Sequence, residues 1–152
     1  MKRDMSSYQE RLTPNPWIYL AVFLVVPASA MIFAPINIPV GIVVGIVLFA
    51  ACVFFLWAGA PVIRVQEGEL RAGRASIPLS ALGEATAYEG EAALEQMRWR
   101  LDGRAWHMLR GWVGPQVLRI AVDDPEDPTP YWLLSSRSPQ RLAAAIESGR
   151  AR

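Results

Sequence analysis

Arginine and tryptophan side chains are interleaved over a short stretch of the C-terminal half, and together these residue types could hold phosphate groups. Arginine forms paired, charge-assisted hydrogen bonds to phosphate, and tryptophan favours the boundary between a membrane and water. Aromatic rings beside arginine also stack on the bases of single-stranded nucleic acid. We name as the Arg/Trp region the six residues Arg98, Arg100, Arg104, Trp106, Arg110 and Trp112.

A simpler interpretation of the Arg/Trp region is a pair of β-strands with tryptophan facing inward and arginine facing outward. Trp99, between Arg98 and Arg100, has the alternation that a strand requires. If the region is instead a binding surface, we expect anionic lipid headgroups or a protein as its ligand. Nucleic acid is disfavoured, because from Val62 onward twelve arginines face twelve acidic residues, whereas nucleic-acid binding relies on neutralising several phosphates.

A second cluster of residues that could bind a ligand is the acidic loop, which contains Asp123, Asp124, Glu126 and Asp127. Its carboxylates are the oxygen ligands that Ca²⁺ and Mg²⁺ prefer, but the glycine and the spacing of an EF-hand are missing. The favoured alternative is a turn in which aspartate side chains accept hydrogen bonds from nearby backbone N–H groups. We therefore predict no metal site, although the sequence alone does not decide whether a cation binds here.

Catalytic groups are sparse. His107 is the only histidine, and no nucleophile-elbow motif surrounds Ser135 or Ser136. Walker A and dinucleotide fingerprints are also missing. The single cysteine, Cys52, excludes a disulfide within the chain. We predict a protein that is not an enzyme, with no catalytic residues and no cofactor.

A long stretch of the sequence contains no charged residue. No Lys, Arg, Asp, Glu or His lies between Leu12 and Ile63, and the stretch holds two apolar runs, 17–33 and 40–58. About 20 apolar residues in a helix span the roughly 30 Å of membrane hydrocarbon. We predict a lead-in over 1–16, a transmembrane helical hairpin over 17–61 and a domain over 62–152. Pro27 should kink the first helix, and Gly41 and Gly45 should let helices approach closely.

Basic residues predict how the hairpin is oriented. Arginine and lysine concentrate in cytoplasmic segments, and they flank the hairpin, whereas the connector 34–39 has none. The flanking residues are Lys2, Arg3, Arg11, Arg64, Arg71 and Arg74. We expect a multi-pass protein of the cell (inner) membrane with both termini cytoplasmic. A cleaved signal peptide ending near Ala30 is the disfavoured alternative, because the apolar run continues beyond that residue.

The segment after Pro61 changes from helical to strand periodicity. Glycine turns predict strands over 62–65, 69–72, 75–79, 83–88, 106–109, 116–122 and 131–135. Helices are predicted over 91–97 and, after the N-cap Ser138, to Glu147, with Leu142 and Ile146 on one buried face. The expected fold is a membrane α-helical hairpin followed by a small α+β domain. That domain would be a bent antiparallel sheet or split barrel with a C-terminal helix, which resembles bacterial pleckstrin-homology-like domains.

Three sets of motifs carry a resemblance to one family. The segments 8–12, 68–79 and 123–137, which include Gly68-Glu69-Leu70-Arg71 and Pro130-Tyr131-Trp132, resemble the actinobacterial membrane-protein family named domain of unknown function 3093. The resemblance spans nearly the whole chain. It implies a two-helix inner-membrane protein without an established function, and it carries no catalytic or ligand residues.

The function that these observations favour is a non-enzymatic, membrane-anchored binding or scaffold module. Its ligand would be lipid headgroups, another membrane or cytoplasmic protein, or a second copy of the chain, held by the Arg/Trp region or by an exposed sheet edge. The alternative is an accessory subunit of a transporter or cell-envelope enzyme complex. In that case the hairpin would make the working contact through Gly41 and Gly45.

Overall fold

The computed structural model describes residues 8–151, which divide into two compact units. One unit, here called the apolar hairpin, comprises residues 13–60. The other, here called the α+β domain, combines residues 61–151 with the described end of the N-terminal segment, 8–12. Lys2 and Arg3, which contributed to the orientation argument, lie outside the described residues.

The apolar hairpin contains three helices: α1 (Pro16–Phe23), α2 (Val25–Phe33) and α3 (Ile38–Ala58). Taken as one span, α1 and α2 are long and apolar enough to cross a membrane, and so is α3. The chain breaks between α1 and α2 at Leu24. Pro27 explains the break, because it has no N–H to donate to the carbonyl of Phe23, four residues earlier.

Small residues lie where α2 and α3 meet. Gly41 and Gly45 are buried, and a Cβ atom added at Gly41 would lie 2.9 Å from the Cα atom of Ala30. A Cβ atom added at Gly45 would lie 2.8 Å from the Cα atom of Val26. Both glycines therefore face α2 of the same chain, in the close approach that small residues permit.

Eight strands of the α+β domain form two four-stranded sheets. Sheet A has the order β1-β2-β3-β4, with bounds Tyr8–Arg11, Val62–Gln66, Glu69–Ala72 and Ala75–Pro78. Sheet B has the order β5-β7-β8-β6, with bounds Leu82–Glu89, Gln116–Val122, Tyr131–Ser135 and Trp106–Met108. The helices are α4 (Gly90–Arg98) and α5 (Pro139–Arg150), with short 3₁₀ turns η1 (Leu79–Ala81) and η2 (Gly111–Val113).

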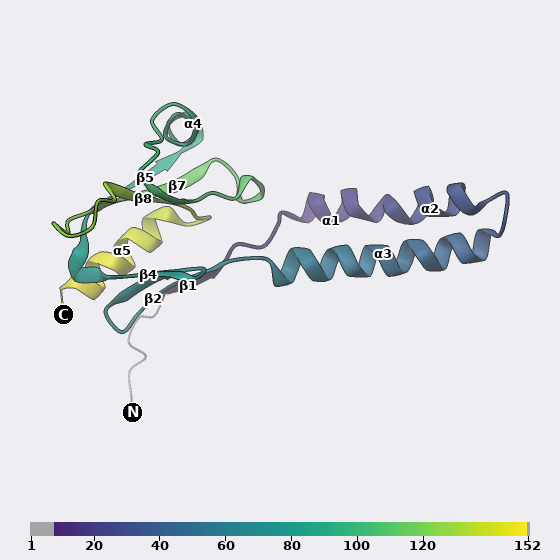
Figure 1. The fold of residues 1–152 in the computed structure, drawn as a ribbon, viewed down its shortest axis with the longest axis horizontal. Helices are drawn as coiled ribbons and strands as arrows, with labels where there is room; N and C mark the ends of the chain where they lie inside the picture. The colour runs from purple at the N-terminus through teal and green to yellow at the C-terminus, as the bar shows by residue number, and fades with distance from the viewer. Residues whose placement is uncertain (1–7, 152) are drawn as a thin grey trace. The chain divides into compact units, whose positions relative to one another are not determined.

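Both faces of sheet B are covered (Figure 1). Helix α5 lies between the two sheets, and α4 covers the opposite face of sheet B. Leu142 and Ile146 of α5 are fully buried in the core shared by the two sheets, as predicted. A smaller core under α4 contains Ala93, Val117 and Leu133. Strand β8 is buried along its whole length because it contributes to both cores.

The sheets are open, which corrects the expectation of one bent sheet or a barrel. Pro78 ends β4, and the η1 turn that follows redirects the chain, so that β5 starts sheet B instead of continuing sheet A. Strands β6 and β8 run parallel, whereas the prediction was antiparallel throughout. The pleckstrin-homology-like resemblance stays a prediction.

The N-terminal segment, expected to be a lead-in, supplies an edge strand of sheet A. Strand β1 pairs antiparallel with β2, with Arg11 opposite Val62. One residue further, the backbone N–H of Leu12 donates to the carbonyl of Pro61 at 2.9 Å, and the Leu12 side chain is fully buried. The apolar hairpin is therefore inserted between two paired strands of the α+β domain.

Glu10 ties β1 to the start of α5. Its carboxylate accepts hydrogen bonds from the Ser136 hydroxyl at 2.6 Å, the Arg137 backbone N–H at 2.7 Å and the Tyr8 hydroxyl at 2.7 Å. The Trp112 indole N–H donates to the Leu12 carbonyl at 3.1 Å. Since hydrogen bonds to charged groups contribute about 1.5–3 kcal/mol each, these contacts fix β1 beyond its ladder with β2.

We predict that the α+β domain needs β1 but not the apolar hairpin. Replacing residues 13–60 with Asn-Gly, which favours a two-residue β-turn, should give a chain that unfolds cooperatively in urea. A chain starting at Pro61 should lose at least about 2–5 kcal/mol of unfolding free energy, since the buried Leu12 side chain alone is worth that much. Equal urea midpoints for the two chains would contradict the structural role of β1.

We also predict a loss of stability in alkali that depends on Tyr8. Burial raises the pKa of the Tyr8 phenol to about 12, and the hydrogen bond to Glu10 acts in the same direction. The folded state therefore keeps this proton above pH 10, where the unfolded chain releases it. The stabilisation should be complete below about pH 10 and disappear as the pH rises to about 12. In urea titrations, Tyr8→Phe should show a shallower decline over this range than the unmodified chain.

Candidate functional site

The structure divides the Arg/Trp region between the two ends of β8. Near the start of β8, the Tyr131 hydroxyl donates to the Arg100 carbonyl at 2.9 Å. At the other end, the backbone N–H of Arg110 donates to the Ser135 hydroxyl at 2.9 Å. Four residues of extended strand separate Tyr131 from Ser135 by about 13 Å. Arg98, Arg100 and Arg104 therefore form one group, and Arg110 and Trp112 form another.

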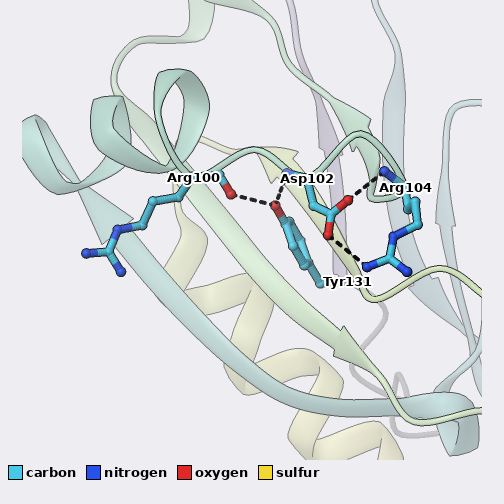
Figure 2. A network of polar contacts seen from close by, with 4 residues as sticks. All are labelled: Arg100, Asp102, Arg104 and Tyr131. Carbon is cyan, nitrogen blue, oxygen red and sulfur yellow. Dashed lines mark hydrogen bonds and ion pairs between the residues drawn. The ribbon is translucent and has the colours of Figure 1, made fainter.

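The first group lies on a loop that Tyr131 holds in place (Figure 2). The buried Tyr131 hydroxyl accepts a hydrogen bond from the Asp102 backbone N–H at 2.8 Å while it donates to the Arg100 carbonyl. The Asp102 carboxylate in turn accepts from the Arg104 backbone N–H at 2.9 Å and from its guanidinium at 3.4 Å. These two contacts, the backbone one foremost, hold the pKa of the Asp102 carboxyl below its ordinary value.

Trp99 lies exposed where this loop leaves α4. Its side chain is 84% exposed, and among the described residues of the α+β domain no other large apolar side chain is exposed. The prediction of a strand with Trp99 facing inward is wrong, because α4 extends to Arg98 and the Trp99 N–H closes its last turn on the Glu95 carbonyl. We call Arg98, Trp99 and Arg100 the Trp99 knob.

The two arginines of the Trp99 knob are both exposed. The Arg100 Nε atom lies 2.7 Å from the Glu95 carboxylate, and its side chain points away from Asp102 and Arg104 (Figure 2). Such surface ion pairs contribute only about 0–1 kcal/mol, so the Arg100 guanidinium remains available for exchange with a ligand. A loop held by the Tyr131 hydroxyl thus presents an exposed indole between two basic groups.

Trp106, which pairs with Trp132 on β8, and the second group both serve packing. Trp106 stacks on Trp132 with ring centroids 4.2 Å apart, against the core. Trp112 donates to the Leu12 carbonyl, and the Arg110 guanidinium lies 5.7 Å from the Trp112 ring centroid. The Arg110 Nε atom is buried and has no hydrogen-bond partner among the described residues. These residues connect β6 and η2 to the point where β1 ends.

Arg119 is a site residue that sequence reasoning missed. Its guanidinium lies 4.1 Å from the Tyr131 ring centroid and donates to the buried Gln96 side chain at 3.4 Å. It therefore holds α4 against the same tyrosine that anchors the loop. The available signal was a single arginine inside the otherwise apolar strand run 117–122.

The acidic loop has the hydrogen bonds of a turn. The Asp124 carboxylate accepts from the Glu126 N–H at 3.0 Å, and that of Asp127 accepts from the Thr129 N–H at 2.9 Å. Hydrogen bonds from Thr129 hold the pKa of the Asp127 carboxyl below its ordinary value. Over residues 8–151, no three His, Cys, Asp or Glu side chains are grouped as metal ligands.

The remaining candidate groups have structural contacts. His107 is exposed on β6, and its Nδ1 atom lies 3.4 Å from the Ala105 carbonyl oxygen. The Ser135 hydroxyl accepts from Arg110, and the Ser136 hydroxyl donates to Glu10. Both serine hydroxyls thus make structural hydrogen bonds between segments that are distant in the sequence.

A comparison with models of known protein families found a match. Residues 7–146 match the model of a family described as "Protein of unknown function (DUF3093)". The matched range includes all three sets of motifs that carry the resemblance. Searches of the curated proteins and of the solved structures found no match.

We predict that the Tyr131 hydroxyl fixes the loop that carries the Trp99 knob. Tyr131→Phe removes both loop hydrogen bonds but keeps the ring that packs under Arg119, so unfolding free energy should fall by about 1–3 kcal/mol. Hydrogen exchange at the Asp102 amide should accelerate. Tyr88→Phe is the matched control, because the Tyr88 hydroxyl makes no hydrogen bond to the described residues. Unchanged exchange at Asp102 would contradict this role.

Proposed function

The chain belongs to DUF3093, a family of unknown function, and we propose that it is a non-enzymatic binding or scaffold module anchored by two membrane-spanning helices. The match confirms the family resemblance seen in the sequence. The finer assignment rests on two observations: the surface of the apolar hairpin and the Trp99 knob.

The surface of the apolar hairpin supports a membrane anchor. Every exposed residue of its helices is apolar, many of them large, and only Ser29, Gly41 and Gly45 among its helical residues are buried. A helix pair that is apolar all round requires an apolar environment. The arginines that flank the hairpin favour both termini on the cytoplasmic side of the cell membrane.

The exposed Trp99 side chain carries the proposal of a binding module. Tryptophan and arginine are the residues that most often dominate binding energy at protein interfaces, where an apolar pocket covers them. Exposing an indole to water is unfavourable, and nothing in the α+β domain covers this one among the described residues. Because Tyr131 already orders the loop, binding would cost little conformational entropy.

The partner that this geometry favours is a protein with an apolar pocket for Trp99 and acidic groups for Arg98 and Arg100. The alternative, an accessory subunit that acts through Gly41 and Gly45, has less support. Both glycines are already covered by α2, so a second protein would have to use other residues of the hairpin.

Photo-crosslinking in cells tests the proposal. A benzophenone amino acid at position 99 of the full chain should give one discrete protein adduct, which weakens when Arg98→Glu and Arg100→Glu are added. The same probe in place of the exposed Glu126, on the acidic loop, is the control position. If position 99 gives no adduct beyond those at position 126, the Trp99 knob is not a binding surface.

A further inference from the structure

The outer face of sheet A, on the side of the sheet that faces away from α5, carries a second basic surface. Strand periodicity places Leu70 and Ile77 in the core and turns their neighbours outward. Four of these outward-facing residues, one from each strand, are cross-strand neighbours and form a single row across the sheet. The row is Gln9, Arg64, Arg71 and Ser76, and all four are exposed.

Two arginines are direct cross-strand neighbours in this row. Arg64 on β2 is paired with Arg71 on β3, and like charges in this position destabilise a sheet. Arg71 lies 3.2 Å from Glu69, whereas Arg64 makes no ion pair with the described residues. A hollow of about 100 Å³ is lined by the two arginines together with Gln66, Glu67 and Glu69. An anion that contacts both guanidinium groups would remove the repulsion.

Basic residues gather at the end of sheet A where the chain leaves for the apolar hairpin. Arg11 is opposite Val62 at that end, and Arg74 lies in the turn that joins Ala72 to Ala75. Glu67 and Glu69 lie at the opposite end, around the turn between β2 and β3. The charge on this face is therefore polarised, with its positive end nearest to the hairpin along the chain.

Chain length keeps this positive end close to the ends of the helices. Residues 13–15 join Leu12 to α1, and residues 59–61 join α3 to β2. Each connection covers four Cα–Cα steps and spans at most about 14 Å, which is of the same order as the Debye length of about 10 Å at moderate salt. If the helices enter a membrane at these ends, the short connections favour an effect of its surface potential on the end of sheet A that carries Arg74.

We propose that the outer face of sheet A binds the phosphate groups of anionic membrane lipids, with Arg64 and Arg71 as the central pair. This inference rests on the membrane anchor of the proposed function and uses a different surface from the Trp99 knob. Charge complementarity favours a lipid surface over a single dissolved anion. Phosphates spread over a leaflet can contact Arg64 and Arg74 together, whereas one anion in the hollow would face Glu69.

The test measures how well the lipid protects this face in the full chain. The protein, carrying Cys52→Ala and Ser76→Cys, is placed in nanodiscs of phosphatidylcholine alone or mixed equally with phosphatidylglycerol. A neutral, water-soluble maleimide then reports access to position 76. The thiol should react about fivefold or more slowly in anionic discs, because each arginine near such a surface is worth about a fivefold factor. High salt should remove the difference.

Matched variants decide the outcome. Arg64→Gln with Arg71→Gln should abolish the protection, whereas Arg141→Gln with Arg150→Gln removes the same charge from α5 and should retain it. Equal reaction rates in the two kinds of disc, or protection that survives Arg64→Gln with Arg71→Gln, would overturn the inference. Extraction of the chain from membranes by alkaline carbonate reports on the anchor separately, so a failed anchor is distinguishable from a failed lipid contact.

Discussion

The antiparallel pairing of Tyr8–Arg11 with Val62–Gln66 is the interaction on which the rest of the α+β domain depends. It covers one edge of β2, brings Leu12 into the core and presents the Leu12 carbonyl to Trp112. It also delivers the Glu10 carboxylate to Ser136 and Arg137, at the joint between β8 and α5. The strand and Leu12, which follows it, thus contact sheet A, η2 and the start of α5. Two covalent links join the apolar hairpin to the domain, one after Leu12 and one before Pro61.

Burial on both faces of sheet B places the hydroxyl that anchors the loop after α4 on a strand packed on both sides. Strand β8 alternates side chains between the core shared with α5 and the core under α4. The Tyr131 ring therefore cannot move without disturbing Leu133 and Ala93, and its hydroxyl holds the 100–102 backbone from a fixed position. Trp99 and its neighbouring arginines extend from that fixed loop. The exposed indole is thus a consequence of how α4 ends, with the Glu95 carbonyl accepting from both Trp99 and Arg100.

Turn residues and apolar periodicity made most strands and helices of this fold predictable from the sequence. The features that were predicted wrongly or not at all depend largely on contacts between residues far apart in the chain. Glycine turns at Gly68 and Gly73 located β2, β3 and β4, and apolar periodicity located β7, β8 and α5. Strand β1 was missed because Glu10 faces inward, where an apolar residue is expected, and because its partner is about fifty positions away. Trp99 was misplaced because three alternating residues fit a strand as well as a helix end. The role of the Tyr131 hydroxyl could not be predicted, because the residue lies in an apolar strand and its hydrogen-bond partners are about thirty positions away. The division into two sheets was not predicted either, because it depends on the η1 turn.

Insertion of the hairpin between paired strands also sets an order of events during synthesis. β1 leaves the ribosome first, but it has no partner until all of α1, α2 and α3 have followed. Closing a flexible loop of that length carries an entropy cost that grows with the logarithm of its length, whereas a formed helical hairpin already holds its two ends near each other. The helices should therefore assemble before the domain does, and the waiting β1 segment, with Glu10 unpaired and Leu12 in water, would exist as a nascent intermediate until β2 emerges. A chain whose helices fail to pair would leave this segment as an unpaired strand, with its backbone hydrogen-bonding groups and the Leu12 side chain exposed to water.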